Sequence, residues 1–65
     1  MRPNEILAAL MLKERRSAEI ARKFNVSKTM INRVIYGHST SRRIQEEIAD
    51  ILEKPVSEIW PERAA

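Results

Sequence analysis

The hydrophobic residues of this chain recur every three or four positions, which is the spacing of amphipathic helices. One set falls in a segment from residue 3 to about residue 13: Ile6, Leu7, Leu10 and Met11. A later set falls between residue 41 and about residue 53: Ile44, Ile48, Ile51 and Leu52. We expect a helix over each segment, with its apolar set buried. Pro55 ends the later helix, and residues 56–60 predict a short last helical turn before Pro61.

Residues 17–36 predict two short helices joined by a tight turn. Their apolar positions lie at helical spacing on one face of each helix: Ile20 and Phe24, then Ile31 and Val34. Ala21 is small enough for the two backbones to cross closely at that point. Val26 lies in the turn, where it can fill the space between the helices.

Polar residues and one glycine mark the ends of these two helices. Ser17 and Ser27 are good N-caps, because a serine oxygen can accept from a free N–H of the first turn. Asn25 tolerates the left-handed conformation that usually ends a helix. Gly37, the only glycine of the chain, follows the second helix and predicts its end.

The expected fold is all-α, a compact bundle of four helices plus the short C-terminal turn. A chain of 65 residues predicts one domain over residues 1–65, and no cysteine is present to form a disulfide bond. No apolar run approaches the roughly 20 residues of a membrane span, and no signal peptide is visible. The sequence therefore predicts a cytoplasmic protein with no membrane partner.

Charge is distributed unevenly along the chain. The net charge is only +3, yet residues 17–43 carry six basic groups and one acid, whereas residues 44–65 carry two basic groups and six acids. Such a split indicates one side that faces a polyanion and another that faces solvent. A patch of this kind also arises in many small basic proteins, so charge alone leaves both interpretations open.

The outer face of the second short helix carries side chains suited to reading DNA bases: Lys28, Thr29, Asn32 and Arg33. Arginine can bind guanine through two hydrogen bonds, asparagine can bind adenine, and threonine can touch a thymine methyl. On an isolated helix an ordinary solvated face would explain these residues equally well. The preceding helix and turn favour the base-reading interpretation.

Arg42 and Arg43 lie where a helix N-terminus would favour acids. Free backbone N–H groups at that position can bind an anion, so the two arginines suit a DNA phosphate. The other candidates for phosphate contact are Ser17, Arg22, Lys23, Ser27, Ser39, Thr40 and Ser41. Simple solvation, or helix capping for the serines, is the competing interpretation at each position.

No pattern in the sequence indicates catalysis, a metal site or a cofactor. His38 is the only histidine, and the chain lacks the cysteines or further histidines that usually hold a metal. No nucleophile and orienting acid stand at a useful spacing. We expect Trp60 to anchor the core and Tyr36 to pack at a helix end.

The segments SAEIARKFNVSKTMINRVIY, RRIQEEIADIL and KPVSEIWP together resemble the helix-turn-helix domains of the lambda repressor and Cro superfamily. Within it they are most similar to the Ner-like phage regulators. The resemblance implies that residues 27–36 form the recognition helix, with Lys28, Thr29, Asn32 and Arg33 toward bases. It also implies phosphate contacts from Ser17 and from the loop before the next helix. The chain departs from the family at Asn25, where many members have glycine, and in the loop GHSTSRR.

The sequence thus predicts a sequence-specific double-stranded DNA-binding transcriptional regulator, a phage or prophage repressor acting in a bacterial cell. Such proteins bind inverted repeats as two copies, and a small dimer contact could form only on DNA. The alternative is a protein-interaction module, antitoxin-like or polymerase-binding. It would use the apolar stripe near Met11 and Leu12 or the acidic face of the helix expected between residue 41 and about residue 53.

Overall fold

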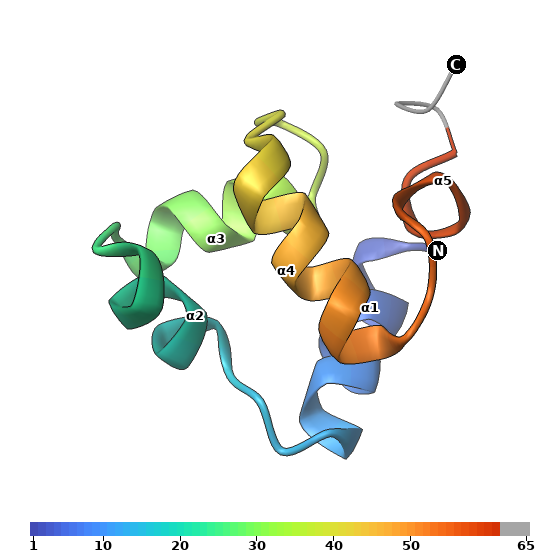
Figure 1. Ribbon diagram of the computed structural model, residues 1–65, viewed down its shortest axis with the longest axis horizontal. Helices are drawn as coiled ribbons and strands as arrows, with labels where there is room; N and C mark the ends of the chain where they lie inside the picture. The colour runs from blue at the N-terminus through green and yellow to red at the C-terminus, as the bar shows by residue number, and fades with distance from the viewer. Residues whose placement is uncertain (62–65) are drawn as a thin grey trace.

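The computed structural model describes residues 1–61 and shows helices joined by short connections (Figure 1). Within these residues the helices are α1 (Pro3–Leu12), α2 (Ser17–Phe24), α3 (Lys28–Ile35), α4 (Arg42–Leu52) and α5 (Val56–Ile59). Their order and approximate bounds are those that the hydrophobic spacing predicts. The expected bundle of four helices and a final turn is confirmed.

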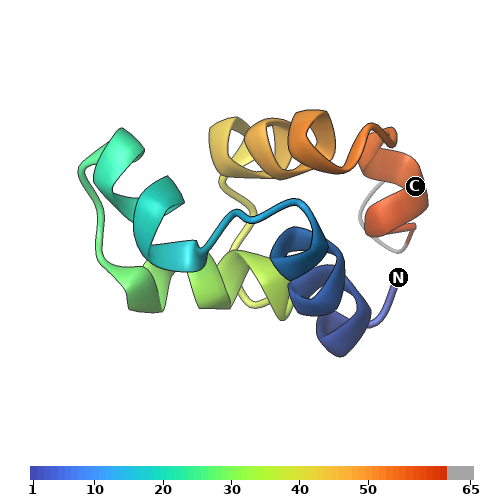
Figure 2. The same ribbon diagram turned by 90° about the horizontal axis from the view of Figure 1, so that it is seen from below.

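The helices pack in two layers with α2 at one end. Figure 2 shows α4 on one side of the molecule and α1 and α3 on the other. α4 contacts α1, α3 and α5, while α2 packs mainly on α3. α3 therefore touches α1, α2 and α4, and it is the helix through which the other parts are joined.

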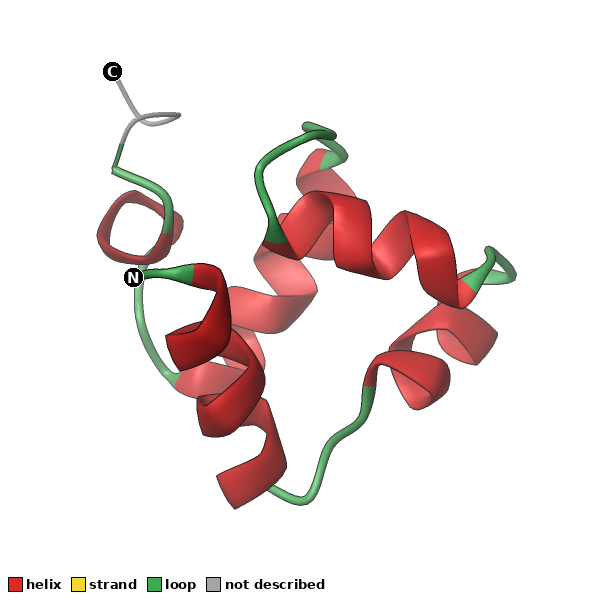
Figure 3. Ribbon diagram, turned by 180° about the vertical axis from the view of Figure 1, so that it is seen from behind, coloured by secondary structure: helices red, strands yellow, loops and turns green. Residues whose placement is uncertain are grey.

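The described residues contain helices, turns and loops but no strand (Figure 3). Within residues 1–61 no helix is both long enough and apolar enough to cross a membrane.

A single apolar core lies between the layers. Its fully buried large side chains come from α1, α3, α4 and α5: Ile6, Leu10, Ile31, Val34, Ile35, Ile48 and Ile59. Ala21 is only 4% exposed, as expected for a residue at the contact of α2 with α3. The core thus takes apolar residues from every helix.

The prediction that Met11 is buried is wrong, because its side chain is 77% exposed. α1 packs on α3 and α4 along the line of Ile6 and Leu10. Met11 follows Leu10 by one residue, or about 100° around the helix, and so turns away from both partners. Leu12 is 85% exposed at the end of the same helix.

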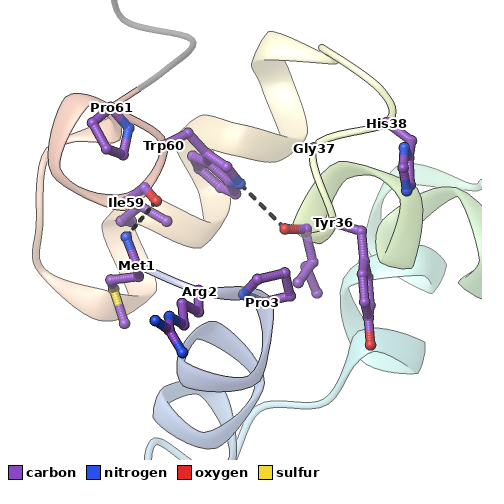
Figure 4. Close-up of a pocket in the computed structure, with 10 residues that line it drawn as sticks. Met1, Arg2, Pro3, Tyr36, Gly37, His38, Ile59, Trp60 and Pro61 are labelled. Carbon is purple, nitrogen blue, oxygen red and sulfur yellow. Dashed lines mark hydrogen bonds between the residues drawn. The ribbon is translucent and has the colours of Figure 1, made fainter.

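Trp60 anchors the end of the described chain to the core (Figure 4). The residue is 6% exposed, and its Nε1 donates to the main-chain oxygen of Ile35 at 3.4 Å. In the same region the amino group of Met1 donates to the oxygen of Ile59 at 2.9 Å. The prediction of a packed Tyr36 is wrong, since this side chain remains 49% exposed at the end of α3.

Each connection between successive helices uses one residue in the left-handed conformation: Glu14, Asn25, Gly37 and Glu53. After each of them, the next N–H donates to a carbonyl five residues back. These bonds run from Arg15 to Leu10, Val26 to Ala21, His38 to Arg33 and Lys54 to Ala49, at 2.8 to 3.1 Å. The four helices therefore end in the same Schellman geometry, and the sequence prediction covered only Asn25 and Gly37.

Two of these helix ends are joined by an ion pair. The Lys13 ammonium lies 2.9 Å from the Glu53 carboxylate and links the end of α1 to the end of α4. The hydrogen bond from Lys13, followed by its Coulomb attraction, holds the pKa of Glu53 below its ordinary value. The pair thus persists to lower pH and weakens as the pH falls through that lowered pKa.

The N-terminal caps follow the sequence prediction at only one of the two serines. Ser27 accepts from the N–H of Met30 at 3.2 Å and caps α3 as predicted. The prediction that Ser17 caps α2 is wrong, because Arg16 holds the N-cap position and Ser17 is already helical. Ser17 is instead 8% exposed, with its side chain turned into the protein.

Replacement of Glu14 by glycine should stabilise the fold. A non-glycine residue in the left-handed conformation costs about 1–2 kcal/mol, which exceeds the added backbone entropy of glycine in the unfolded chain. We expect Glu14→Gly to raise the free energy of unfolding by about 0.5–1 kcal/mol in urea titrations. Glu19→Gly, inside α2, is the matched control and should lower it by about 1 kcal/mol. A loss of stability at both positions would contradict the proposed strain at Glu14.

Candidate nucleic-acid interface

The four predicted base-reading residues share the outer side of α3. Lys28, Thr29 and Arg33 are exposed and Asn32 is half-buried. The opposite side of α3 carries Ile31, Val34 and Ile35, all buried in the core. Burial of that side fixes the rotation of the helix, and the polar side is therefore held toward solvent.

A shallow depression of about 200 Å³ lies along this outer side. Its lining residues are Thr29, Asn32, Arg33, Tyr36 and His38. The sequence assigned Tyr36 to packing and left His38 only the modest possibility of a loop position near phosphate. Tyr36 lies one helical turn after Arg33, and the turn at Gly37, which directs the chain back past the end of α3, brings His38 to the same depression.

Asn32 is tied to α2 by a hydrogen bond from Ser17. The Ser17 hydroxyl donates to Oδ1 of Asn32 at 3.4 Å. The bond occupies the amide oxygen and leaves the amide nitrogen free to donate elsewhere. Ser17 therefore positions a candidate base-reading side chain, a role that its place in the sequence did not indicate.

The basic residues of α2 lie in different surroundings. Arg22 is exposed. Lys23 is exposed as well, but its ammonium lies 2.9 Å from the carboxylate of Glu47 on α4. Lys23 would have to leave this ion pair, or share it, to reach a phosphate.

The loop after α3 places Ser39, Thr40 and Ser41 ahead of α4. The Ser39 hydroxyl donates to the sulfur of Met30 at 3.7 Å, which ties the loop to α3. Thr40 is exposed. Ser41 is the N-cap residue of α4, yet its side chain accepts no capping hydrogen bond.

Arg42 and Arg43 have different partners although they are adjacent in sequence. Nε of Arg42 lies 3.5 Å from the carboxylate of Glu46, one turn along α4, and its side chain is 87% exposed. The guanidinium of Arg43 lies over the ring of Phe24, 5.5 Å from its centroid. Arg43 is therefore held against α2 by a cation–π contact, whereas Arg42 remains within its own helix.

A family model described as winged helix-turn-helix DNA-binding matches residues 1–64 of the chain. The chain belongs to this winged helix-turn-helix family. No curated protein and no solved structure gives a match. The prediction of a helix-turn-helix DNA-binding protein is confirmed by the family match.

In this winged helix-turn-helix protein, α2 and α3 are the paired helices and Asn25 is in the turn between them. A wing is a strand hairpin, and residues 1–61 contain no strand. After α3 the described chain enters the loop at residues 38–41 and then α4. Within the described residues, the segments that follow α3 are therefore that loop and the start of α4, and not a strand hairpin.

No group of histidine, cysteine, aspartate or glutamate side chains within residues 1–61 is arranged to hold a metal ion. The outer side of α3 carries hydrogen-bond donors and positive charges on a hydrophobic scaffold.

The link between Ser17 and Asn32 can be measured by a double-mutant cycle. Ser17→Ala and Asn32→Ala, singly and together, should give a coupling of about 0.5–1.5 kcal/mol in the free energy of unfolding, the contribution of one hydrogen bond. The exposed Ser57 provides the control, since Ser57→Ala should not couple to Asn32→Ala. Equal couplings for the two serines would show that the bond from Ser17 contributes nothing.

Proposed function

We propose that this chain is a sequence-specific regulator of transcription that binds double-stranded DNA and inserts residues 27–36 into the major groove. The observation that carries the proposal is the division of α3 into a buried apolar side and an outer side of hydrogen-bond donors. Membership of a DNA-binding family supports DNA as the ligand of this surface. An α-helix fits the major groove, where each base pair presents a distinct pattern of donors and acceptors.

Four side chains would read bases in this proposal. Arg33 is suited to the N7 and O6 acceptors of guanine, and Lys28 can contact the same atoms. The amide nitrogen of Asn32 can donate to adenine N7, and the Thr29 methyl can touch a thymine methyl.

The residues around α3 would hold the DNA backbone. Arg22 and Lys23 on α2, Ser27 at the start of α3, and Ser39, Thr40 and Ser41 in the loop are the proposed contacts. Ser17 would act through its main-chain N–H, because its hydroxyl faces Asn32. Arg42 and Arg43 would complete this set, with Arg43 supported by the ring of Phe24.

The regulator would be a phage or prophage repressor similar to the Ner-like proteins, acting as a single domain over residues 1–65 in the bacterial cytoplasm. Two copies would occupy an inverted repeat, one per half-site, with a contact formed on DNA. The sequence segments that resemble the Ner-like regulators support this finer assignment. The symmetry of the site follows from the two-fold relation between two identical chains.

Loss of a base-reading side chain should weaken binding to the preferred sequence more than binding to random DNA. For a duplex selected from a random pool, we expect Arg33→Ala and Lys28→Ala to cost about 1–3 kcal/mol each in binding free energy. Lys54→Ala is the control, since Lys54 pairs with Glu58 away from α3. Fluorescence anisotropy at low salt measures the affinities. Parental affinity in both Arg33→Ala and Lys28→Ala would refute the base-reading assignment.

Loss of a phosphate contact should weaken binding to all sequences. Arg42→Ala and Arg43→Ala should each lower the magnitude of the slope of log K against log salt by about 0.9, since one fewer counterion is released on binding. Titrations of a selected and an unrelated duplex at several salt concentrations measure this slope. If the variants give the same slope as the parent on both duplexes, these arginines do not contact phosphate.

A further inference from the structure

An open groove of about 610 Å³ lies beside the start of α3, bounded by the end of α1, the connection to α2 and the first turns of α2 and α3. Leu7, Leu10 and Met11 of α1 supply its apolar floor. Met11 is 77% exposed, so a large hydrophobic side chain is presented to solvent there. An exposed apolar surface with a polar rim is typical of a protein-interaction site.

Every charged residue that lines the groove is basic. Arg15 and Arg16 lie in the connection between α1 and α2, and Lys28 opens α3. None of the described residues that line the groove is acidic. An occupant that complements both the floor and the rim carries an apolar stripe flanked by carboxylates, as an acidic amphipathic helix does.

Other occupants complement this groove less well. A DNA backbone would satisfy the three basic residues but would leave Leu7 and Met11 facing phosphates and sugars. A second copy related by a two-fold axis would bring Arg15, Arg16 and Lys28 toward the same residues of its partner. Like charges placed together in this way oppose association.

The groove adjoins the surface that would read DNA. Lys28 and Asn32 line the groove and also belong to the outer side of α3. A helix seated in the groove would cover both side chains. In the proposed function, the same two side chains must be free to enter the major groove of DNA.

We infer that this groove binds an acidic amphipathic helix of a partner protein, and that this helix and DNA exclude one another. The binding of the helix stands independently of the proposed function, whereas the exclusion rests on it. A partner of this kind would release the regulator from DNA by occupying Lys28 and Asn32.

The test uses the full chain and a fluorescein-labelled model peptide of about four helical turns, with leucine at helical spacing and glutamate elsewhere. Two control peptides replace either the leucines by serine or the glutamates by lysine. Anisotropy without DNA should show binding of the first peptide and weaker or no binding of both controls. If the serine peptide binds as tightly as the first peptide, the apolar floor has no role in binding. If the lysine peptide binds as tightly as the first peptide, the basic rim has no role.

Met11 and Leu12 form a matched pair of variants. Both side chains are exposed, at 77% and 85%, so neither substitution should unfold the protein, but only Met11 lines the groove. Met11→Ser should weaken peptide binding by about fivefold to tenfold, the effect of losing part of one buried hydrophobic side chain, and Leu12→Ser should not. Absence of peptide binding to the parent, or an equal effect of both variants, would overturn the proposal.

Competition with DNA tests the exclusion. The peptide should displace a labelled duplex from the parent, and Met11→Ser should bind the duplex normally while resisting displacement. A ternary complex of chain, duplex and peptide would overturn the exclusion while leaving peptide binding intact. Loss of duplex binding in Met11→Ser would assign the groove to DNA. If the parent sediments as a dimer and Met11→Ser sediments as a monomer, the groove binds a second copy of the chain. Either of these last two results would overturn the proposed partner.

Discussion

Ile31, Val34 and Ile35 pack the inner side of α3 against the core, and this contact fixes the direction of the polar side of that helix. α3 is only eight residues long and touches α1, α2 and α4. A rotation of α3 would expose apolar side chains, at a cost of about 1.5–3 kcal/mol for each one fully exposed. The same rotation would turn Lys28 and Arg33 toward the core. The direction of the polar side is thus a consequence of the packing.

The helix ends contribute the second constraint. A left-handed residue after each of the first four helices reverses the chain within a few residues and keeps the connections short. The turn at Asn25 holds α2 across α3, while the turn at Gly37 brings His38 and the following loop beside Arg33. Because these ends are built from backbone hydrogen bonds, the arrangement of surfaces depends little on the exposed side chains in the turns.

The N-terminal region of α3 is where two surfaces meet. Lys28 and Asn32 belong both to the proposed DNA-reading side and to the groove floored by Leu7, Leu10 and Met11. Asn32 also receives the Ser17 hydroxyl and is thereby linked to α2. A small domain has little surface in which to separate its functions, so two partners at this place would compete through the same side chains.

The amino-acid sequence by itself determined the helices, their order, the helix-turn-helix at residues 17–36 and the face on which Lys28, Thr29, Asn32 and Arg33 lie. These features follow from local rules of hydrophobic spacing, capping and left-handed residues. Only the tertiary structure decided the exposure of Met11, the contact of Arg43 with Phe24 and the turning of Ser17 toward Asn32. Each depends on which helices meet across the core. The left-handed Glu14 and Glu53 belong to the same group, because glutamate carries no local preference for that conformation and the packing of the helices imposes it.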